Sequence, residues 1–172
     1  ISQSVLDETK KIISLNKKNI LIAPASSGNT TMWHFTYFIE LMKKLDNKFN
    51  CFFIIAVDSS EREEKIANEI IKSFGKDKTI SLGNKTISQT MPIISCCNVA
   101  ICNDTSFQHL SCGLNVPTLI LRFDTPDAYS SYSKFQYSIL PEGYAKINHD
   151  SRADPSLISV DTILAKTLKL IN

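Results

Sequence analysis

Short apolar segments alternate with longer amphipathic ones along this chain, a pattern typical of repeated βα units around a parallel sheet. Residues 78–82 alternate between polar and apolar positions, whereas the other apolar segments are almost continuously hydrophobic, as expected for strands covered on both faces. We therefore predict an α/β fold with a doubly wound parallel sheet and with residues 78–82 toward one edge. The predicted strands are residues 20–24, 51–57, 78–82, 99–103 and 117–121.

Amphipathic segments predict helices between these strands. Residues 61–74 end at Gly75, a residue type that commonly follows a helix. Residues 88–96 contain Pro92, which a helix tolerates only near its first turn. Ser159 is expected to cap the last helix, with Asp161 in the first turn of that helix. The predicted helices are residues 3–15, 34–46, 61–74, 88–96, 105–112 and 160–171.

Residues 122–150 lose this periodicity and become rich in Tyr, Phe and Ser. We predict a long surface excursion there, with one short strand at residues 136–140. Its aromatic side chains could stack on a nucleobase or a sugar, but packing against the sheet edge is the favoured interpretation. These aromatic residues are Phe123, Tyr129, Tyr132, Phe135, Tyr137 and Tyr144.

Length and composition indicate one globular domain. The chain has 172 residues, of which 43% are hydrophobic and 21% charged, and this excludes a disordered protein. We divide it into a leading or interdomain helix (1–18), an α/β core (19–150) and a C-terminal helix (151–172). The chain begins with Ile and has no signal-peptide pattern, so we expect it to be an excised part of a longer protein.

Charge and cysteine content exclude several partners. The formal net charge is +2 without a basic stripe, so no nucleic-acid partner is predicted. No apolar run approaches the roughly 20 residues needed to span a bilayer. The five cysteines lie within apolar runs and are interpreted as buried thiols in a reducing compartment. Adjacent Cys96 and Cys97 lack the spacing of a zinc site, so no metal is predicted.

Ligands of open α/β sheets bind beyond the carboxyl ends of the strands. The loop from Ala25 to Thr31 lies at such an end and includes Ser27 and Gly28, so its hydroxyls and backbone could hold phosphate oxygens. The chain has neither a P-loop nor a GxGxxG motif, which argues against a Walker-type ATPase and a standard dinucleotide site. A solvated turn explains this loop equally well.

Residues 103–109 give the strongest local signal, because a buried strand ends there and a short helix begins. Asp104 is expected to cap that helix, which leaves the N–H groups of Thr105, Ser106 and Phe107 as an anion site that fits a diphosphate. The alternative is an ordinary N-cap with His109 as a hydrogen-bonded core histidine.

A family resemblance rests on these residues. The segment NDTSFQHLSCGLNVPTLIL (103–121) resembles the DTGxxHLAAALxxPTxxLFG signature of glycosyltransferase family 9, the lipopolysaccharide heptosyltransferases and their relatives. Residues 20–33, which end in Trp, are similar to the family's PGA…KxWP loop. Residues 82–86 are similar to its LxGKTSL element, and residues 125–127 lie near its GPTDP turn. Several motifs in a fixed order, spread over most of the chain, are more specific than any one of them.

The resemblance implies a Rossmann-like domain, as in the C-terminal half of a GT-B enzyme, that binds a nucleotide-diphosphate sugar as substrate with no other cofactor. It implies that Asp104 faces the donor sugar hydroxyls or caps the phosphate-binding helix. The implied donor and diphosphate site comprises Ser27, Thr31, Asp104, Thr105, Ser106 and His109. The implied nucleotide site comprises Glu61, Lys85 and Thr86, with Asp58 or Glu63 as alternatives to Glu61.

The implied activity is that of the donor-binding half of an inverting glycosyltransferase, which transfers a sugar to a cell-envelope glycan such as lipopolysaccharide. Heptose is one candidate for that sugar. In this family the catalytic base lies in the N-terminal half, so this chain is expected to hold no catalytic residue and to be inactive alone. The implied partner is that N-terminal acceptor domain, and the implied location is the cytoplasm, with the inner face of the bacterial inner membrane as one place of action.

Three departures from the family pattern keep alternatives open. Thr31 replaces a Lys that neutralises the diphosphate, Ser106 replaces a Gly, and His34 replaces a Pro. Lys85 or Arg122 could restore the charge only if the fold brings one of them near. The alternatives are a non-catalytic glycosyltransferase-like module that binds a nucleotide, a glycan or only a partner, and a nucleotide-sugar epimerase or another GT-B relative.

Overall fold

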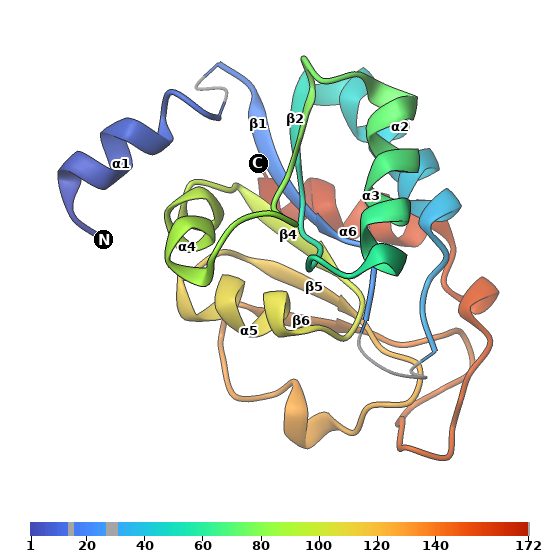
Figure 1. Cartoon of the computed structure of the whole chain (residues 1–172). Helices are drawn as coiled ribbons and strands as arrows, with labels where there is room; N and C mark the ends of the chain where they lie inside the picture. Colours follow the sequence, from blue (N-terminus) through green and yellow to red (C-terminus); the bar gives the residue numbers. More distant parts are fainter. Residues whose placement is uncertain (14–15, 27–30, 172) are drawn as a thin grey trace.

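The computed structural model describes residues 1–13, 16–26 and 31–171. Its sheet has six parallel strands in the order β3-β2-β1-β4-β5-β6 (Figure 1). The strands are β1 (Lys18–Ala23), β2 (Cys51–Ile55), β3 (Thr79–Ser81), β4 (Val99–Cys102), β5 (Thr118–Leu121) and β6 (Gln136–Ile139). The predicted doubly wound sheet is confirmed, with β3 at one edge. Because β1 pairs with both β2 and β4, the order of strand addition reverses there, and the loops after β1 and β4 are neighbours.

Helices cover both faces of this sheet. One face carries α2 (Phe35–Phe49), α3 (Glu61–Phe74) and α6 (Val160–Ile171), and the other carries α4 (Ile87–Ser95) and α5 (Ser106–Gly113). The remaining helix, α1 (Gln3–Thr9), lies at the side of the domain against α4 and ends before the predicted residue 15 (Figure 1). None of the helices in the described part of the chain is long and apolar enough to cross a membrane.

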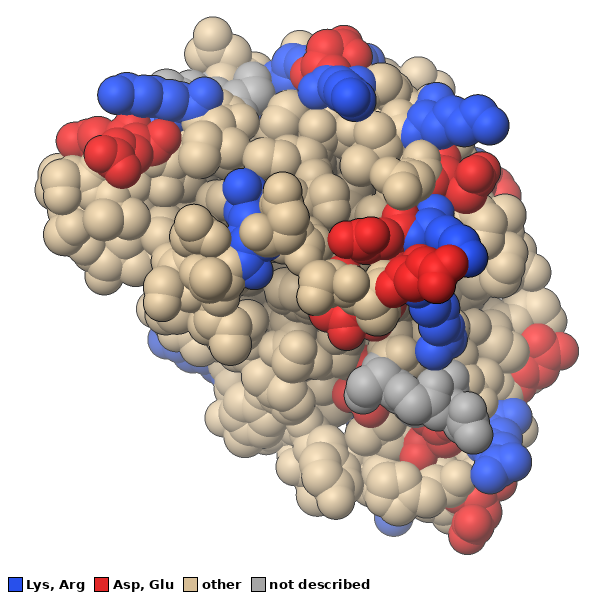
Figure 2. Space-filling model, viewed as in Figure 1, with Lys and Arg blue, Asp and Glu red and all other residues tan. Residues whose placement is uncertain are grey.

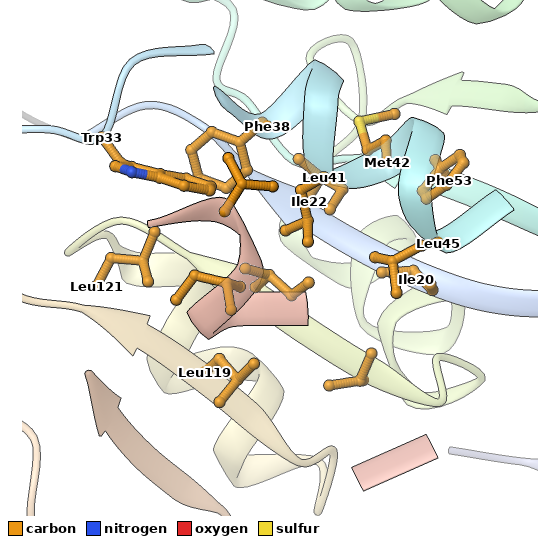
Figure 3. Packing of buried hydrophobic residues seen from close by; sticks show 14 of the residues in the cluster. Ile20, Ile22, Trp33, Phe38, Leu41, Met42, Leu45, Phe53, Leu119 and Leu121 are labelled. Carbon is orange, nitrogen blue, oxygen red and sulfur yellow. The ribbon is translucent and has the colours of Figure 1, made fainter. Parts of the chain in front are cut away.

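Alternate residues of β1 point into two separate core layers. Ile20 and Ile22 pack into the layer beneath α2 and α6, whereas Leu21 packs into the layer beneath α4 and α5, and all three are fully buried. Figure 3 shows the first layer, where Trp33 and Phe38 lie against each other above the strands. The continuous apolar strands are therefore buried on both faces, as their sequences predict.

The structure corrects the expectation for Pro92. It is the sixth residue of α4 and lies beyond the first turn. The helix starts early because Thr86 and Gln89 form a capping box, in which each side chain accepts a hydrogen bond from the backbone N–H of the other, at 3.4 and 2.9 Å. The buried Pro92 consequently deprives the carbonyl of Ser88 of its helical donor.

Residues 122–150 are a surface excursion only in part. Their first four residues, 122–125, are buried directly after β5, and β6 forms where residues 136–140 predict a strand. The packing interpretation is confirmed for Phe123 and is wrong for the exposed Tyr129, Tyr132, Tyr137 and Tyr144. This segment therefore brings aromatic side chains to the surface beyond β5.

The five cysteines are free, and all except the half-buried Cys96 are buried, as predicted. Burial raises the pKa of the Cys51 thiol to about 12. In the described ranges, no group of three or more His, Cys, Asp or Glu side chains could hold a metal ion.

Candidate functional site

Two different regions occupy the carboxyl edge of the sheet. One, called here the polar cluster, comprises Asn103, Asp104, Arg122, Asp124 and Thr125 after β4 and β5. The other, called the apolar cavity, lies beyond β2 and β3 against the amino ends of α4 and α5 and has a volume of about 530 Å³. The residues that line it are Val57, Asp58, Ser59, Leu82, Gly83, Lys85, Ile87, Thr90, Ser106, Phe107, His109 and Leu110.

Asn103 anchors the loop after β1 to β4. Its side chain is fully buried, and its Oδ1 accepts a hydrogen bond from the N–H of Trp33 at 2.9 Å. Its Nδ2 donates to the carbonyls of Pro24 at 2.7 Å and Trp33 at 3.1 Å. The indole N–H of Trp33 in turn donates to the carbonyl of Ile158 at 2.9 Å. One amide side chain therefore binds the backbone at both Pro24 and Trp33.

Asp104 does not cap α5, which corrects that expectation. The N-cap is Thr105, whose backbone is extended and whose side chain makes no capping hydrogen bond. The Asp104 carboxylate is held elsewhere, because Oδ1 accepts from Nε2 of Gln108 at 2.8 Å and Oδ2 accepts from the Thr125 hydroxyl. The first-turn N–H groups of α5 are consequently left without a capping side chain from the described residues, as an anion site requires.

Arg122 is not a replacement for the expected lysine. Its side chain is only 1% exposed, and Nε and Nη2 both donate to the carbonyl of Thr125, at 2.9 and 2.5 Å. Its Nη1 is bound to Asp127 and lies 3.4 Å from the Ser138 hydroxyl. The guanidinium thus closes the turn after β5 and is committed to protein acceptors.

The position of the expected lysine lies beside a carboxylate. The N–H of Thr31 donates to Oδ2 of Asp124 at 2.9 Å, and Asp124 is 9% exposed. Ser27, predicted to bind the same diphosphate, lies outside the described residues. The polar cluster is therefore more acidic than the resemblance implies.

The predicted nucleotide residues lie at different distances from the apolar cavity. Lys85 lines it, whereas the hydroxyl of the exposed Thr86 takes part in the capping box of α4. Glu61 is exposed, pairs with Lys65 at 2.7 Å and does not line the cavity. Of the two alternatives to Glu61, Asp58 lines the cavity and Glu63 does not.

Glu63 instead holds the loop after β2. Its Oε2 accepts a hydrogen bond from the N–H of Asp58 at 2.8 Å. Burial raises the pKa of Glu63, and the hydrogen bond from Asp58 works in the opposite direction. Asp58 is therefore the better placed of these carboxylates for contact with a ligand.

His109 is exposed, so its interpretation as a core histidine is wrong. It follows Thr105 and Ser106 by four and three residues and hence lies on their face of α5. Nδ1 of His109 is hydrogen-bonded to the hydroxyl of Tyr132. The structure thus brings Thr105, Ser106 and His109 together at the amino end of one helix.

Charges of both signs are mixed over the face seen in Figure 2, with no continuous basic patch. The structural role of Asn103 and the contacts of Gln108 were not predicted from the sequence, because an isolated amide has no recognisable pattern. Ile87, which is 66% exposed at the cavity, was not predicted either. The signal that could have indicated it is its position directly after the loop of residues 83–86, which contains the polar Asn84, Lys85 and Thr86.

The sequence of the chain is similar to that of a known protein family. Residues 1–146 match the family model described as glycosyltransferase family 9 (heptosyltransferase). No curated protein matches the sequence significantly.

Among solved structures, Escherichia coli ADP-heptose lipopolysaccharide heptosyltransferase II matches with a TM-score of 0.80 and 20% identity, over 99% of this chain and 52% of that one. A glycosyltransferase family 9 protein from Veillonella parvula matches with a TM-score of 0.78 and 14% identity, over 99% and 52%. E. coli heptosyltransferase WaaC, solved with ADP-2-deoxy-2-fluoro heptose, matches with a TM-score of 0.68 and 13% identity, over 95% of this chain and 47% of that one. The likeness establishes the fold, and the chain spans about half the length of these proteins.

Proposed function

The chain belongs to glycosyltransferase family 9, the heptosyltransferase family, and from this premise we propose that it is the donor-binding half of an inverting glycosyltransferase. Its ligand would be a nucleotide-diphosphate sugar, with heptose as one candidate sugar. A cell-envelope glycan such as lipopolysaccharide would be the acceptor, and the reaction would take place in the cytoplasm, where the inner face of the inner membrane is one possible site.

The observation that carries this proposal is the apolar cavity beside the uncapped amino end of α5. Its volume of about 530 Å³ falls within the range of small-ligand sites, roughly 300–1,000 Å³. Ile87, Phe107 and Leu110 offer it apolar surface for a nucleobase. Asp58, which also lines the cavity, could accept hydrogen bonds from ribose hydroxyls. Ser106 lines the cavity as the first residue of α5, so a diphosphate attached to that nucleoside would reach the helix N–H groups.

In this mechanism, an acceptor hydroxyl displaces the nucleoside diphosphate from the anomeric carbon, and the base that takes the hydroxyl proton belongs to an N-terminal acceptor domain. The contribution of this chain is to position the donor and to stabilise the charge that develops on the leaving diphosphate. Asp104, whose two oxygens are already held by Gln108 and Thr125, would present a fixed carboxylate to the donor sugar.

The second candidate function is a non-catalytic glycosyltransferase-like module, and the contacts of two residues favour it. Thr31 carries no charge and donates its N–H to Asp124, while Arg122 is used within the protein. Lys85 lines the apolar cavity immediately before the N-cap of α4. A leaving group with two or more negative charges would then gain no cationic support from Thr31 or Arg122, which favours a module that binds the ligand without turning it over.

Thermal-shift and calorimetric titrations with ADP, UDP, GDP and their sugar conjugates test the proposal. We expect one nucleotide series to stabilise the chain, and we expect Asp104→Ala to weaken binding of the sugar conjugate more than binding of the free diphosphate. Turnover by a full-length protein that includes the acceptor domain would separate the enzyme from the module. No stabilisation by any of these ligands at millimolar concentration would reject the donor-binding role.

A further inference from the structure

Tyr132 and His109 form a pair beside the apolar cavity that the family resemblance does not explain. Their rings stack with centroids 5.6 Å apart and an interplanar angle of 25°, and Nδ1 of His109 is hydrogen-bonded to the Tyr132 hydroxyl. His109 lines the cavity, whereas Tyr132 belongs to the segment that follows β5. The pair therefore connects the apolar cavity to the segment between β5 and β6.

Gln108 sets the direction of the hydrogen bonds in this pair. Its side chain is fully buried, with Nε2 at 2.8 Å from Oδ1 of Asp104. A carboxylate only accepts, so the amide must present its NH₂ group there. This orientation leaves Oε1 of Gln108 without a partner among the described residues, which indicates that the two N–H bonds hold the amide in place. The same Nε2 lies 3.4 Å from Nε2 of His109, which must then accept the second hydrogen.

The orientation of the Tyr132 hydroxyl follows from that of Gln108. Since Nε2 of His109 accepts, the neutral imidazole carries its proton on Nδ1 and donates it to the Tyr132 oxygen. The proton of Tyr132 is consequently directed away from His109. Burial raises the pKa of Tyr132 above its ordinary value, although a hydrogen bond with the Gln136 side chain acts in the opposite direction, so the hydroxyl keeps its proton at neutral pH. The residue is 57% exposed, so a ligand can reach its side chain.

This hydroxyl is hydrogen-bonded to His109, which lines the apolar cavity together with Ser106 at the amino end of α5. Helical side chains lean toward the amino end of their helix, and His109 shares a face with Thr105 and Ser106. We propose that Tyr132 is a ligand-binding residue, whose hydroxyl donates to the diphosphate of the donor in the direction set by Gln108 and His109. This neutral donor partly compensates for the lysine that Thr31 replaces, and the inference rests on the proposed function.

Calorimetric titration of the full chain tests this role with ADP, UDP and GDP and with the three corresponding nucleosides. Tyr132→Phe keeps the ring and removes the hydroxyl. We expect it to weaken nucleoside diphosphate binding about tenfold, as for a lost hydrogen bond to a charged acceptor, and to leave nucleoside binding unchanged. Tyr129→Phe is the matched control, because Tyr129 is 55% exposed and packs on a different histidine, His149, with ring centroids 6.0 Å apart.

A second variant tests the orientation by His109. His109→Phe retains a ring for stacking and should cause a similar loss, and adding Tyr132→Phe to it should then change the affinity less than about twofold, because coupled residues are not additive. Independent losses that multiply would reject the orienting role of His109. Wild-type affinity in Tyr132→Phe would reject the inference while leaving the proposed function intact, whereas a wild-type chain that binds no nucleoside diphosphate would reject both.

Discussion

The polar cluster and the apolar cavity lie at the same edge of one sheet but differ in what their side chains contact. In the polar cluster, Asn103, Asp104 and Arg122 each bind at least two protein groups. In the apolar cavity, Ile87 is an apolar side chain left largely in solvent. The first region is satisfied by the fold itself, whereas the second offers surface that a ligand can cover.

This difference separates the residues that shape a site from those that are free to bind. Buried polar groups need partners, so the network after β4 and β5 contributes mainly to the loop conformation. An apolar cavity with a few polar groups at its rim is typical of a small-molecule site. Changes at the buried Asn103 and Arg122 of the polar cluster should therefore act mainly on stability, and changes at the apolar cavity should act on binding.

The largest expected effect comes from Asn103→Ala. Loss of its three hydrogen bonds leaves the buried carbonyls of Pro24 and Trp33 without this donor, so the free energy of unfolding should fall by about 3 kcal/mol. Urea denaturation measures this. The exposed Asn84→Ala serves as control, with a change of at most about 0.5 kcal/mol. Equal effects of the two substitutions would contradict the structural role of the polar cluster.

Ile87→Asp, in contrast, should weaken ligand binding without lowering the stability of the fold. Ile87 is the first residue of α4, whose first turn has no acidic residue, so an aspartate there suits the helix dipole and should leave stability unchanged or slightly higher. A negative charge in place of an apolar contact should weaken nucleoside diphosphate binding about tenfold, or about 1.4 kcal/mol. Calorimetry measures the affinity. Ile12→Asp, at an exposed position outside the cavity, should bind as wild type, and a similar loss in both variants would argue against the apolar cavity as the site.

The smallest effect is expected at the opposite edge of the sheet, where Asp46 accepts from Lys78 at 2.6 Å and from the N–H of Cys51 at 2.9 Å. Burial acts to raise the pKa of Asp46, but these two donors outweigh it and hold the pKa below its ordinary value. Asp46→Asn should cost about 1 kcal/mol at neutral pH and leave ligand affinity unchanged.

The pH dependence gives a second check on Asp46. The pKa of Asp46 is lower in the folded chain than in the unfolded chain. The carboxylate therefore contributes fully to the free energy of unfolding above the unfolded-state pKa of about 3.9, and this contribution disappears as the pH falls through the folded-state pKa. The advantage of wild type over Asp46→Asn, measured by urea denaturation at pH 7, 5 and 3, should therefore shrink only at the lowest pH. A stability difference between wild type and Asp46→Asn that stays the same at all three pH values would show that it does not come from the ionised carboxylate.

The sequence predicted the sheet because its signal is local. Continuous apolar strands can be recognised residue by residue, and the edge position of β3 followed from its alternating pattern. The amino end of α5 was also predictable, since a polar residue after a buried strand marks a helix start.

The partners of the site residues could not be predicted, since they come from distant segments. Asp104 was predicted to cap α5 because only its neighbours in the sequence can be recognised from the sequence. In the fold, its carboxylate instead accepts a hydrogen bond from Thr125, which lies 21 residues later in the chain. Arg122 appeared available for the same reason, and Tyr132 was one aromatic residue in a segment without periodicity. Such contacts depend on how the loops after β4 and β5 are placed in three dimensions.

The most direct test of the account is a methyl NMR spectrum of the full chain, titrated with ADP, UDP and GDP. We predict that one of these nucleotides shifts the methyl resonances of Val57, Leu82, Ile87 and Leu110 in the apolar cavity. The resonances of Leu140 and Leu157, which line a separate cavity of about 370 Å³, should not move. Shifts confined to Leu140 and Leu157, or no shifts with any of the three nucleotides, would contradict it.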